Sequence, residues 1–437
     1  MSVAAVLSKR LVQAVGVAIV AASSMVVDAQ TRTPFDLIIA NGTVVDGTGA
    51  PGRITDIGIR SGRIAEIGVL QSAVARERIS ASGLIVSPGF VDVDTHADDI
   101  ADHPFAEHFL QMGVTTIVAG NCGSSALNIS DAFDRIRAVG ISVNYATLIG
   151  HNTVRDAVMG SSNRLPSMDD LHKMKSLVFR AIIDGAVGFS TGLPYAPGTY
   201  ARTNEITELA RVSANEGGIY ATHLRNEGAG LEASIKESIT VARLIDGPLE
   251  ISHLSVDSPS PRETTARAFA MIDEARKFGI KVQADLYAPT SGPAMAAIGD
   301  ADVAVILRHP MVAIAADPGT TSLGQGLPHQ RGFGDTARVL GKFVRENKVI
   351  TLEEAIRKMT SLPAQFFGFP GRGAIRPGAF ADLVIFDASK IASTATSERP
   401  RAFPVGIAAV LVNGVVTVRN GKHTLAKSGQ IVTKPRK

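Results

Sequence analysis

Strand-like and helix-like segments alternate eight times through the middle of this 437-residue chain, and few folds are compatible with such a repeat. Apolar, β-branched runs predict strands at residues 85–96, 114–119, 141–149, 186–190, 218–223, 249–253, 281–287 and 312–317. Amphipathic stretches predict helices between them, most clearly at residues 171–183, 204–215, 231–245 and 261–278. Eight such units predict an α/β chain with a TIM (β/α)8 barrel, a fold of roughly 250 residues. An open, doubly wound sheet is the alternative.

The two ends of the chain are instead rich in short strands and tight turns. Asn-Gly pairs at 41–42 and 413–414 each stand between β-branched runs, which is typical of hairpins. Neither end has enough strands to bury a sheet face by itself. We therefore predict a small β-sandwich built from residues 33–84 and 366–432, and a barrel formed by residues 85–365.

The first 29 residues have the pattern of a secretory signal peptide. Lys9 and Arg10 precede an apolar run from 11 to 27, and small or apolar residues occupy the positions that a signal peptidase reads. We expect cleavage after Ala29 and export, to the periplasm in a Gram-negative cell. An uncleaved membrane anchor is the alternative, which the short run and its Gln13 disfavour.

Charge and cysteine content narrow the possible functions. Lys and Arg number 44 and Asp and Glu number 41, so the net charge of +3 is too small to favour nucleic-acid binding. After residue 29 no segment is apolar enough to cross a membrane, and we expect a small-molecule partner. The single cysteine, Cys122, cannot form an intramolecular disulfide. In an oxidising compartment it is either a buried thiol or a metal ligand.

Residues suited to metal chemistry stand at or just beyond the ends of five predicted strands. They are Asp94, His96, Cys122, His223, His253 and Asp317. The carboxyl ends of barrel strands meet at one mouth, so we expect these side chains to lie close together. Thiolate, imidazole and carboxylate are zinc ligands. Each residue alone could be a buried thiol, a hydrogen-bonded core histidine or a helix-capping carboxylate, but together they predict a metal site.

Motifs across nearly all of the chain resemble those of the amidohydrolase superfamily, and most closely its N-acyl-D-amino-acid deacylases (D-aminoacylases). The matching segments are Pro88-Gly-Phe-Val-Asp-Val-Asp-Thr-His96, Gly120-Asn-Cys-Gly123, Gly188-Phe-Ser-Thr-Gly-Leu-Pro-Tyr195, Thr222-His-Leu-Arg-Asn-Glu227, Ile251-Ser-His253, His329-Gln-Arg331 and Met359-Thr-Ser-Leu-Pro-Ala364. The Gly-Asn-Cys-Gly segment is the most diagnostic, because most amidohydrolases have no cysteine there.

The resemblance implies a zinc-dependent hydrolase that cleaves the amide bond of N-acyl-D-amino acids. Cys122, His223 and His253 are implied to hold one tightly bound zinc. His96 is implied to line a neighbouring metal position, and Asp317 to be the general base and acid. Zinc lowers the pKa of its bound water from about 15.7 to about 7 and polarises a carbonyl, so attack by metal-bound hydroxide is expected.

The resemblance also implies residues that bind the substrate or support the site. Those implied to contact the substrate are Tyr195, Tyr287 and Arg331. The planar guanidinium of Arg331 fits a carboxylate through two parallel hydrogen bonds, which could select the D enantiomer. Arg225 and Glu227 are candidates to orient the metal ligands from behind, and His151 is a candidate to line the pocket. A structural ion pair and a packing role are the alternatives for these three.

Three positions depart from the family pattern. The first strand ends in Asp94-Thr95-His96, where the family usually has His-x-His, so whether a second metal binds stays open. Ser255 stands where some members have a lysine, so the resemblance implies nothing about a preference for acidic side chains. The segment between Gly292 and Asp300 is short where relatives often carry an inserted domain, and we expect a minimal lid or none.

Two other functions are compatible with these residues. One is a different hydrolase on the same scaffold, such as a cyclic-amide hydrolase or an amino-sugar deacetylase. The other is a non-catalytic relative that binds acylated amino acids or cell-wall fragments, which Asp94 and the short connection after the seventh strand motivate.

Overall fold

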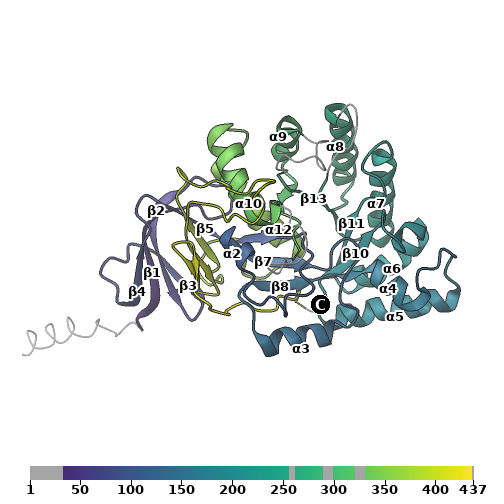
Figure 1. Cartoon of the computed structure of the whole chain (residues 1–437), viewed down its shortest axis with the longest axis horizontal. Helices are drawn as coiled ribbons and strands as arrows, with labels where there is room; N and C mark the ends of the chain where they lie inside the picture. The colour runs from purple at the N-terminus through teal and green to yellow at the C-terminus, as the bar shows by residue number, and fades with distance from the viewer. Residues whose placement is uncertain (1–32, 255–260, 289–298, 320–329, 436–437) are drawn as a thin grey trace, which may run out of the picture.

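The computed structural model describes residues 33–254, 261–288, 299–319 and 330–435. The predicted signal peptide, Ser255 and most of the segment between Gly292 and Asp300 lie outside these ranges. The described residues form a barrel and a sheet domain that lie side by side (Figure 1). None of their helices combines the length and apolar character that crossing a bilayer requires.

The predicted TIM barrel is confirmed. Its strands are β6 (Phe90–Asp92), β7 (Val114–Ala119), β8 (Asn144–Thr147) continued by β9 (Ile149–Gly150), β10 (Gly188–Gly192), β11 (Ile219–His223), β12 (Leu249–Ile251), β13 (Val282–Leu286) and β14 (Val312–Ile314). They pair in parallel, β6 to β8 in one run and β9 to β14 in another. A parallel bridge between His96 and Gly319 joins the end of the first strand to the end of the last. This closure excludes the open doubly wound sheet.

Helices cover the outside of the barrel (Figure 1). They are α2 (Glu107–Gln111), α3 (Ile129–Val139), α4 (His151–Met159), α5 (Met168–Asp184), α6 (Thr203–Asn215), α7 (Leu231–Ile245), α8 (Pro261–Lys277), α9 (Asp300–Arg308), α10 (Arg331–Arg338), the π-helix η3 (Val339–Glu346), α11 (Leu352–Met359) and α12 (Ser361–Phe367), with a short 3-10 turn η1 (Gly198–Tyr200). The four clearest predicted helices are α5 to α8. The first of these begins at a capping box of Ser167 and Asp170 and ends at Gly185, whose left-handed backbone stops it.

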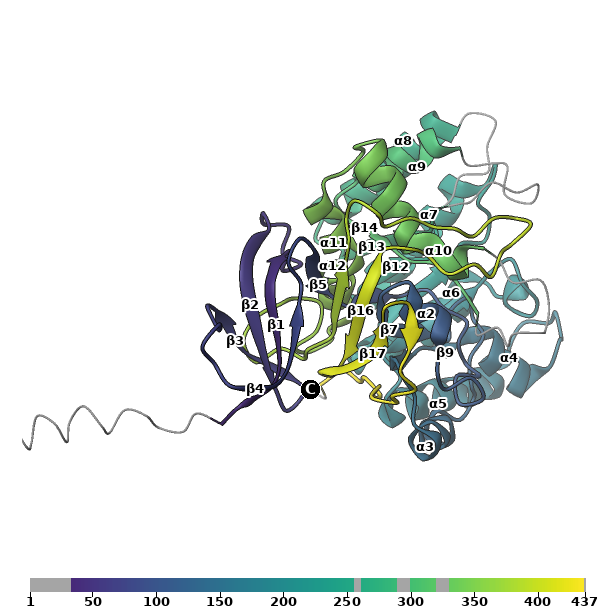
Figure 2. The ribbon, with the colours of Figure 1, turned by 60° about the vertical axis from the view of Figure 1, so that its left-hand side comes forward.

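Both ends of the chain pair into one domain, as predicted. Its strands are β1 (Phe35–Val44), β2 (Arg53–Arg60), β3 (Arg63–Gly68), β4 (Ala75–Ser80), β5 (Ile85–Pro88), β15 (Leu383–Phe386), β16 (Ile407–Val412), β17 (Val415–Arg419) and β18 (Lys422–His423). All nine belong to one hydrogen-bonded sheet, in which β5 lies between β1 and β15. Side chains from β1 and β2 share a core with side chains from β15 and β16, so the sheet folds over that core. The C-terminal strands lie between the N-terminal strands and the barrel (Figure 2).

The strand predicted at residues 85–96 is divided between the two domains. Its first part is β5, which pairs with β1 and β15, and its second part is β6. Gly89 joins them, and a Cβ at this position would overlap the side chain of Thr115. The barrel therefore begins at Phe90 rather than at residue 85, and the preceding four-residue strand ties the terminal sheet to it.

Candidate active site

Three ligand-type atoms converge at the carboxyl ends of the barrel strands. Sγ of Cys122 lies 3.5 Å from Nδ1 of His223 and 3.7 Å from Nε2 of His253. Zinc bound tetrahedrally at about 2.3 Å from sulfur and about 2.0 Å from nitrogen would place those atoms roughly 3.5 Å apart. Cys122 and His253 are buried and His223 is half-buried. The donor types and their spacing therefore fit zinc.

Asp94 and His96 lie next to these three residues. Ligand atoms of Asp94, His96 and Cys122 lie within 4.8 Å of one another, as do those of Asp94, His253 and Asp317. Asp94 is fully buried, and neither of its carboxylate oxygens has a hydrogen-bond partner among the described residues. Burial and the nearby Asp317 raise the pKa of Asp94 to about 6. The structure thus brings all six predicted residues together and offers donors for a second cation.

Asp317 is held between two basic side chains. Its Oδ1 lies 3.1 Å from Nε2 of His96, and its Oδ2 lies 2.6 Å from Nη2 of Arg331. Although burial opposes ionisation, His96 and Arg331 lower the pKa of Asp317. Burial likewise opposes protonation of His96, but hydrogen bonds to Asp317 and Cys122 raise its pKa to about 11. Asp317 is therefore ionised at neutral pH, the state that a proton acceptor needs.

Glu227 lies behind both histidines of the Cys122 cluster. Its Oε1 is 3.1 Å from Nδ1 of His253 and 3.9 Å from Nε2 of His223, the ring nitrogens that do not face Cys122. Burial and the neighbouring His253 lower the pKa of His223 to about 4. A neutral imidazole has a lone pair available for a metal. The place of Glu227 is that of a carboxylate that orients metal-bound histidines.

The cluster, Asp317 and the three predicted substrate residues line one cavity of about 460 Å³. The ring of Tyr195 meets that of His223 edge-on, with centroids 5.0 Å apart, and is 51% exposed. The guanidinium of Arg331 lies over the ring of Tyr287, 4.6 Å from its centroid. Ser124, which directly follows the Gly120-Asn-Cys-Gly123 segment, also lines this cavity and was not among the predicted site residues.

Three predicted site residues do not line this cavity: Asp94, which is buried next to the other ligands, Arg225 and His151. Arg225 donates two hydrogen bonds of 3.0 Å to Glu237, so it forms the structural ion pair that was its alternative. His151 is fully buried, and its Nε2 lies 2.9 Å from Oε1 of Glu205. It begins α4, and its ring is turned toward the helix layer rather than the metal ligands.

Several residues of the site have a strained, left-handed backbone conformation. Three of its residues have a left-handed φ, namely Cys122 (51°), His253 (34°) and Asp317 (49°). Such conformations are unfavourable for residues with a side chain and persist only where neighbours fix them. Nε of Arg331 donates to the carbonyl oxygen of Asp317 at 3.0 Å, and the N–H of His253 donates to Oδ1 of Asp285 at 2.8 Å.

Acidic residues in the barrel interior were missed at the sequence level. Asp92, Glu250 and Asp285 are at most 2% exposed. Burial raises the pKa of each well above its ordinary value, and a neighbouring acid adds to this effect. Asp94 further raises the pKa of Asp92 and of Asp285, and Asp285 further raises the pKa of Glu250. Asp92 and Asp285 stand two residues before Asp94 and Tyr287, on the same strand faces, and this alternation was the available signal.

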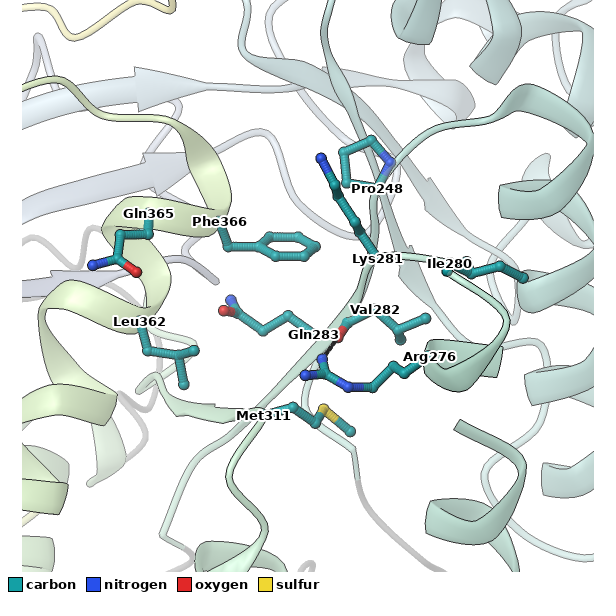
Figure 3. A pocket seen from close by; sticks show the side chains of 11 residues that line it. Pro248, Arg276, Ile280, Lys281, Val282, Gln283, Met311, Leu362, Gln365 and Phe366 are labelled. Atoms are coloured by element: carbon teal, nitrogen blue, oxygen red, sulfur yellow. Dashed lines mark hydrogen bonds between the residues drawn. The ribbon is translucent and has the colours of Figure 1, made fainter. Parts of the chain in front are cut away.

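A second cavity, of about 550 Å³, lies at the opposite end of the barrel (Figure 3). Its lining includes Pro248, Lys281 and Met311, which directly precede β12, β13 and β14, together with Phe366 of α12. Among the described residues, no group of potential metal ligands borders it. The residues suited to catalysis are therefore gathered at the other mouth.

Comparisons with known proteins agree with the fold and the site. Residues 104–418 match the amidohydrolase family. The D-aminoacylase of Alcaligenes xylosoxydans xylosoxydans is 34% identical over 92% of this chain and 98% of that protein. The N-acyl-D-glutamate deacylase of the same organism is 34% identical over 87% of this chain and 93% of its own.

Solved structures give the same result. A crystal structure of D-aminoacylase matches with a TM-score of 0.85 and 32% identity, covering 92% of this chain and all of that one. The N-acyl-D-glutamate deacylase of Bordetella bronchiseptica, complexed with zinc and a phosphonate mimic of the tetrahedral intermediate, matches with a TM-score of 0.84, 32% identity and the same coverage. A D-hydantoinase, at 16% identity and a TM-score of 0.65, shares the fold.

The relatives contain segments that this chain lacks. The alignment with D-aminoacylase spans 475 positions, whereas 92% of this 437-residue chain is about 400 residues. About 70 aligned positions therefore have no counterpart in this chain. The family match, the identity over nearly the full length and the shared fold lead to one conclusion. This chain belongs to the amidohydrolase family and, within it, to the N-acyl-D-amino-acid deacylases.

Proposed function

We propose that this protein is a zinc-dependent hydrolase that cleaves the amide bond of N-acyl-D-amino acids, releasing a carboxylate and a free D-amino acid. The observation that carries the proposal is the position of Asp317 beside Cys122, His223 and His253 in a single cavity. Two relatives aligned over most of this chain are named D-aminoacylase and N-acyl-D-glutamate deacylase, which supports the same substrate class. The likeness to a hydantoinase concerns the fold alone.

Cys122, His223 and His253 are the proposed ligands of one tightly held zinc. When bound, zinc polarises the amide carbonyl and makes a water molecule more acidic. Asp94 and His96 border the place where a second ion would be held. A solved D-aminoacylase is described as having a binuclear metal centre with one-metal activation and second-metal attenuation. We propose that this chain likewise needs one metal for activity, bound at the site that contains Cys122, and that a second metal lowers its activity.

Asp317 is the proposed base and acid. Its carboxylate accepts a proton from the attacking water as the water oxygen bonds to the amide carbon. The same carboxylate then delivers that proton to the amide nitrogen as the carbon–nitrogen bond breaks. His96, 3.1 Å from Oδ1, and Arg331, 2.6 Å from Oδ2, keep the carboxylate in one orientation through both steps.

Arg331 is the proposed partner of the free carboxylate of the substrate. Its guanidinium lines the cavity and is held over the ring of Tyr287. Because a guanidinium carries five N–H donors, it can contact Asp317 and a substrate carboxylate together. If Arg331 fixes the substrate carboxylate and the metal site fixes the amide carbonyl, only one enantiomer places its amide carbon within reach of the attacking water. Tyr195, half-exposed, is placed to contact the substrate.

The test is hydrolysis of N-acetyl-D-methionine and its L enantiomer by zinc-loaded and chelated protein. We expect turnover of the D form that chelation abolishes, that zinc restores and that Asp317→Asn lacks. Equal trace turnover by wild type and Asp317→Asn, with zinc bound to both, would show a non-catalytic binding protein. Cleavage of a hydantoin or an N-acetylated amino sugar in preference to the D substrate would show a different hydrolase.

We also propose that the protein is exported after removal of residues 1–29. The basic pair Lys9 and Arg10, the apolar run and the small residues before the cleavage position support this. Cell fractionation and N-terminal sequencing test it. We expect a periplasmic protein that begins at Gln30, and a membrane-bound protein with its original N-terminus would refute the proposal.

A further inference from the structure

We infer that Asp285 is a positioning residue for the metal site, because it holds His253 in the backbone conformation that its imidazole requires. This inference rests on the proposed function, in which His253 is a zinc ligand. The two residues come from neighbouring elements: Asp285 belongs to β13, and His253 follows β12. Asp285 lies in the barrel interior and is not among the residues that line the active-site cavity.

Asp285 supplies hydrogen-bond acceptors to the chain just beyond the end of the β12 backbone pairing. The pairing of β12 with β13 stops at Ile251 and Ala284. Beyond that point, Oδ1 of Asp285 accepts the N–H of His253 at 2.8 Å, and its carbonyl oxygen accepts the N–H of Leu254 at 2.8 Å. One residue thus fixes two successive N–H groups of the turn that carries the ligand.

This turn needs such support. The φ of His253 is 34°, in the left-handed region that residues with a side chain rarely adopt. If the backbone relaxed, the direction of the Cα–Cβ bond would change and Nε2 would move from its place 3.7 Å from Sγ of Cys122. The side-chain contact of Asp285 therefore bears directly on whether the two ligand atoms face one ion.

Other polar side chains lie beside Asp285 in the barrel interior. Burial and the neighbouring Asp285 raise the pKa of Glu250 well above its ordinary value, and Oε2 of Glu250 accepts a hydrogen bond of 2.9 Å from Nε2 of Gln283. All three side chains are at most 1% exposed. Gln283 lines the cavity at the opposite end of the barrel (Figure 3). A row of polar side chains thus runs from that cavity to His253, in an interior that bulky apolar residues fill in most such barrels.

The test compares two substitutions of the same residue in the full-length protein. Asp285→Ala removes the acceptor, whereas Asp285→Asn keeps an oxygen that can accept the N–H of His253. We expect zinc to bind about 10- to 100-fold more weakly to Asp285→Ala, measured by chelator competition. We also expect altered visible absorption bands when cobalt replaces zinc in this variant. Asp285→Asn should stay within a few-fold of wild type in zinc affinity and keep the wild-type bands.

Asp56→Ala is the matched control. Asp56 is a buried carboxylate, 4% exposed, whose Oδ1 accepts the N–H of Asn41 at 2.8 Å in the terminal sheet. Its removal should lower thermal stability without changing the zinc affinity or the cobalt spectrum. This comparison separates a positioning role from a general loss of stability.

The outcomes are distinguishable. A folded Asp285→Ala with wild-type zinc affinity and cobalt spectrum overturns the inference. If that variant does not fold, Asp285→Ser, which keeps a small polar group but a shorter side chain, is measured in the same way and decides. Wild-type protein that binds no zinc would overturn the proposed function instead, so the two failures cannot be confused.

Discussion

Oε1 of Glu227 lies 3.1 Å from Nδ1 of His253, while the other ring nitrogen of this histidine faces Cys122. The same oxygen is 3.9 Å from Nε2 of His223, whose Nδ1 also faces Cys122. A carboxylate in this place favours the tautomer in which each histidine carries its proton on the side of Glu227. One acidic side chain thereby directs two lone pairs toward the same point.

We expect Glu227→Gln to lower zinc affinity by about 10- to 100-fold, because an amide orients the two rings less strongly than a carboxylate does. Chelator competition on the purified variant measures this effect. Glu237→Gln is the control, since Glu237 is paired with Arg225 rather than with a histidine of the cluster. Equal zinc affinity in wild type and Glu227→Gln would contradict the assigned role.

Asp317→Asn tests the proton-transfer step. An amide cannot accept the proton of the attacking water, so we expect kcat to fall by about 10²- to 10⁴-fold. Zinc content, measured by elemental analysis, should stay at the wild-type value, because Cys122, His223 and His253 are unchanged. A variant that retains zinc and near wild-type kcat would rule out Asp317 as the base.

Much of the fold and of the set of proposed metal ligands could be predicted from sequence, because both depend on local periodicity. The helix predicted at 231–245 and the strand predicted at 114–119 have those bounds in the structure. The cluster followed from the parallel arrangement of the strands, which brings the residues at their carboxyl ends together. The expectation of zinc followed from the thiolate of Cys122 and the imidazoles beside it.

What sequence could not supply are contacts set by the packing between strands. His151 follows a barrel strand just as His253 does, but its ring packs against Phe189 and contacts Glu205 of the helix layer. Asp285 accepts the backbone N–H of His253 just beyond the neighbouring strand, a contact that depends on register and on the left-handed turn at His253. Alternation showed which face these side chains occupy, but not which partner they reach.

Arg331→Met tests recognition of the substrate carboxylate. Removing one partner of a buried charge pair costs about 2–5 kcal/mol, so kcat/KM for N-acetyl-D-methionine should fall by at least about 30-fold. The matched substrate is its carboxamide, which lacks the charge and should lose much less. An equal loss for both substrates would mean that Arg331 acts through Asp317 alone, which it contacts at 2.6 Å.

Lys358 makes the stability of the barrel dependent on pH. It is fully buried, and its Nζ donates to two carbonyl oxygens. One belongs to His309, which precedes β14, and the other to Val312, which begins β14. Burial lowers the pKa of Lys358 to about 8 from its ordinary value of 10.5, although Glu354 on the same helix opposes this and Arg357 adds to it. Between these two pH values the unfolded chain binds more protons than the folded one, so stability rises with pH.

The free energy of unfolding should therefore increase by about 1 kcal/mol between pH 7 and pH 9 through this group. Urea unfolding of wild type and Lys358→Met at both pH values measures it. Because methionine does not titrate, the variant should lack this increment, whatever its stability at pH 7. Lys342→Met, which removes a lysine only 31% exposed that pairs with Asp300 on the barrel exterior, should keep the wild-type pH dependence. If the free energy of unfolding rises by the same amount between pH 7 and pH 9 in Lys358→Met and in wild type, Lys358 keeps its proton in the folded barrel. The pKa assigned to Lys358 would then be wrong.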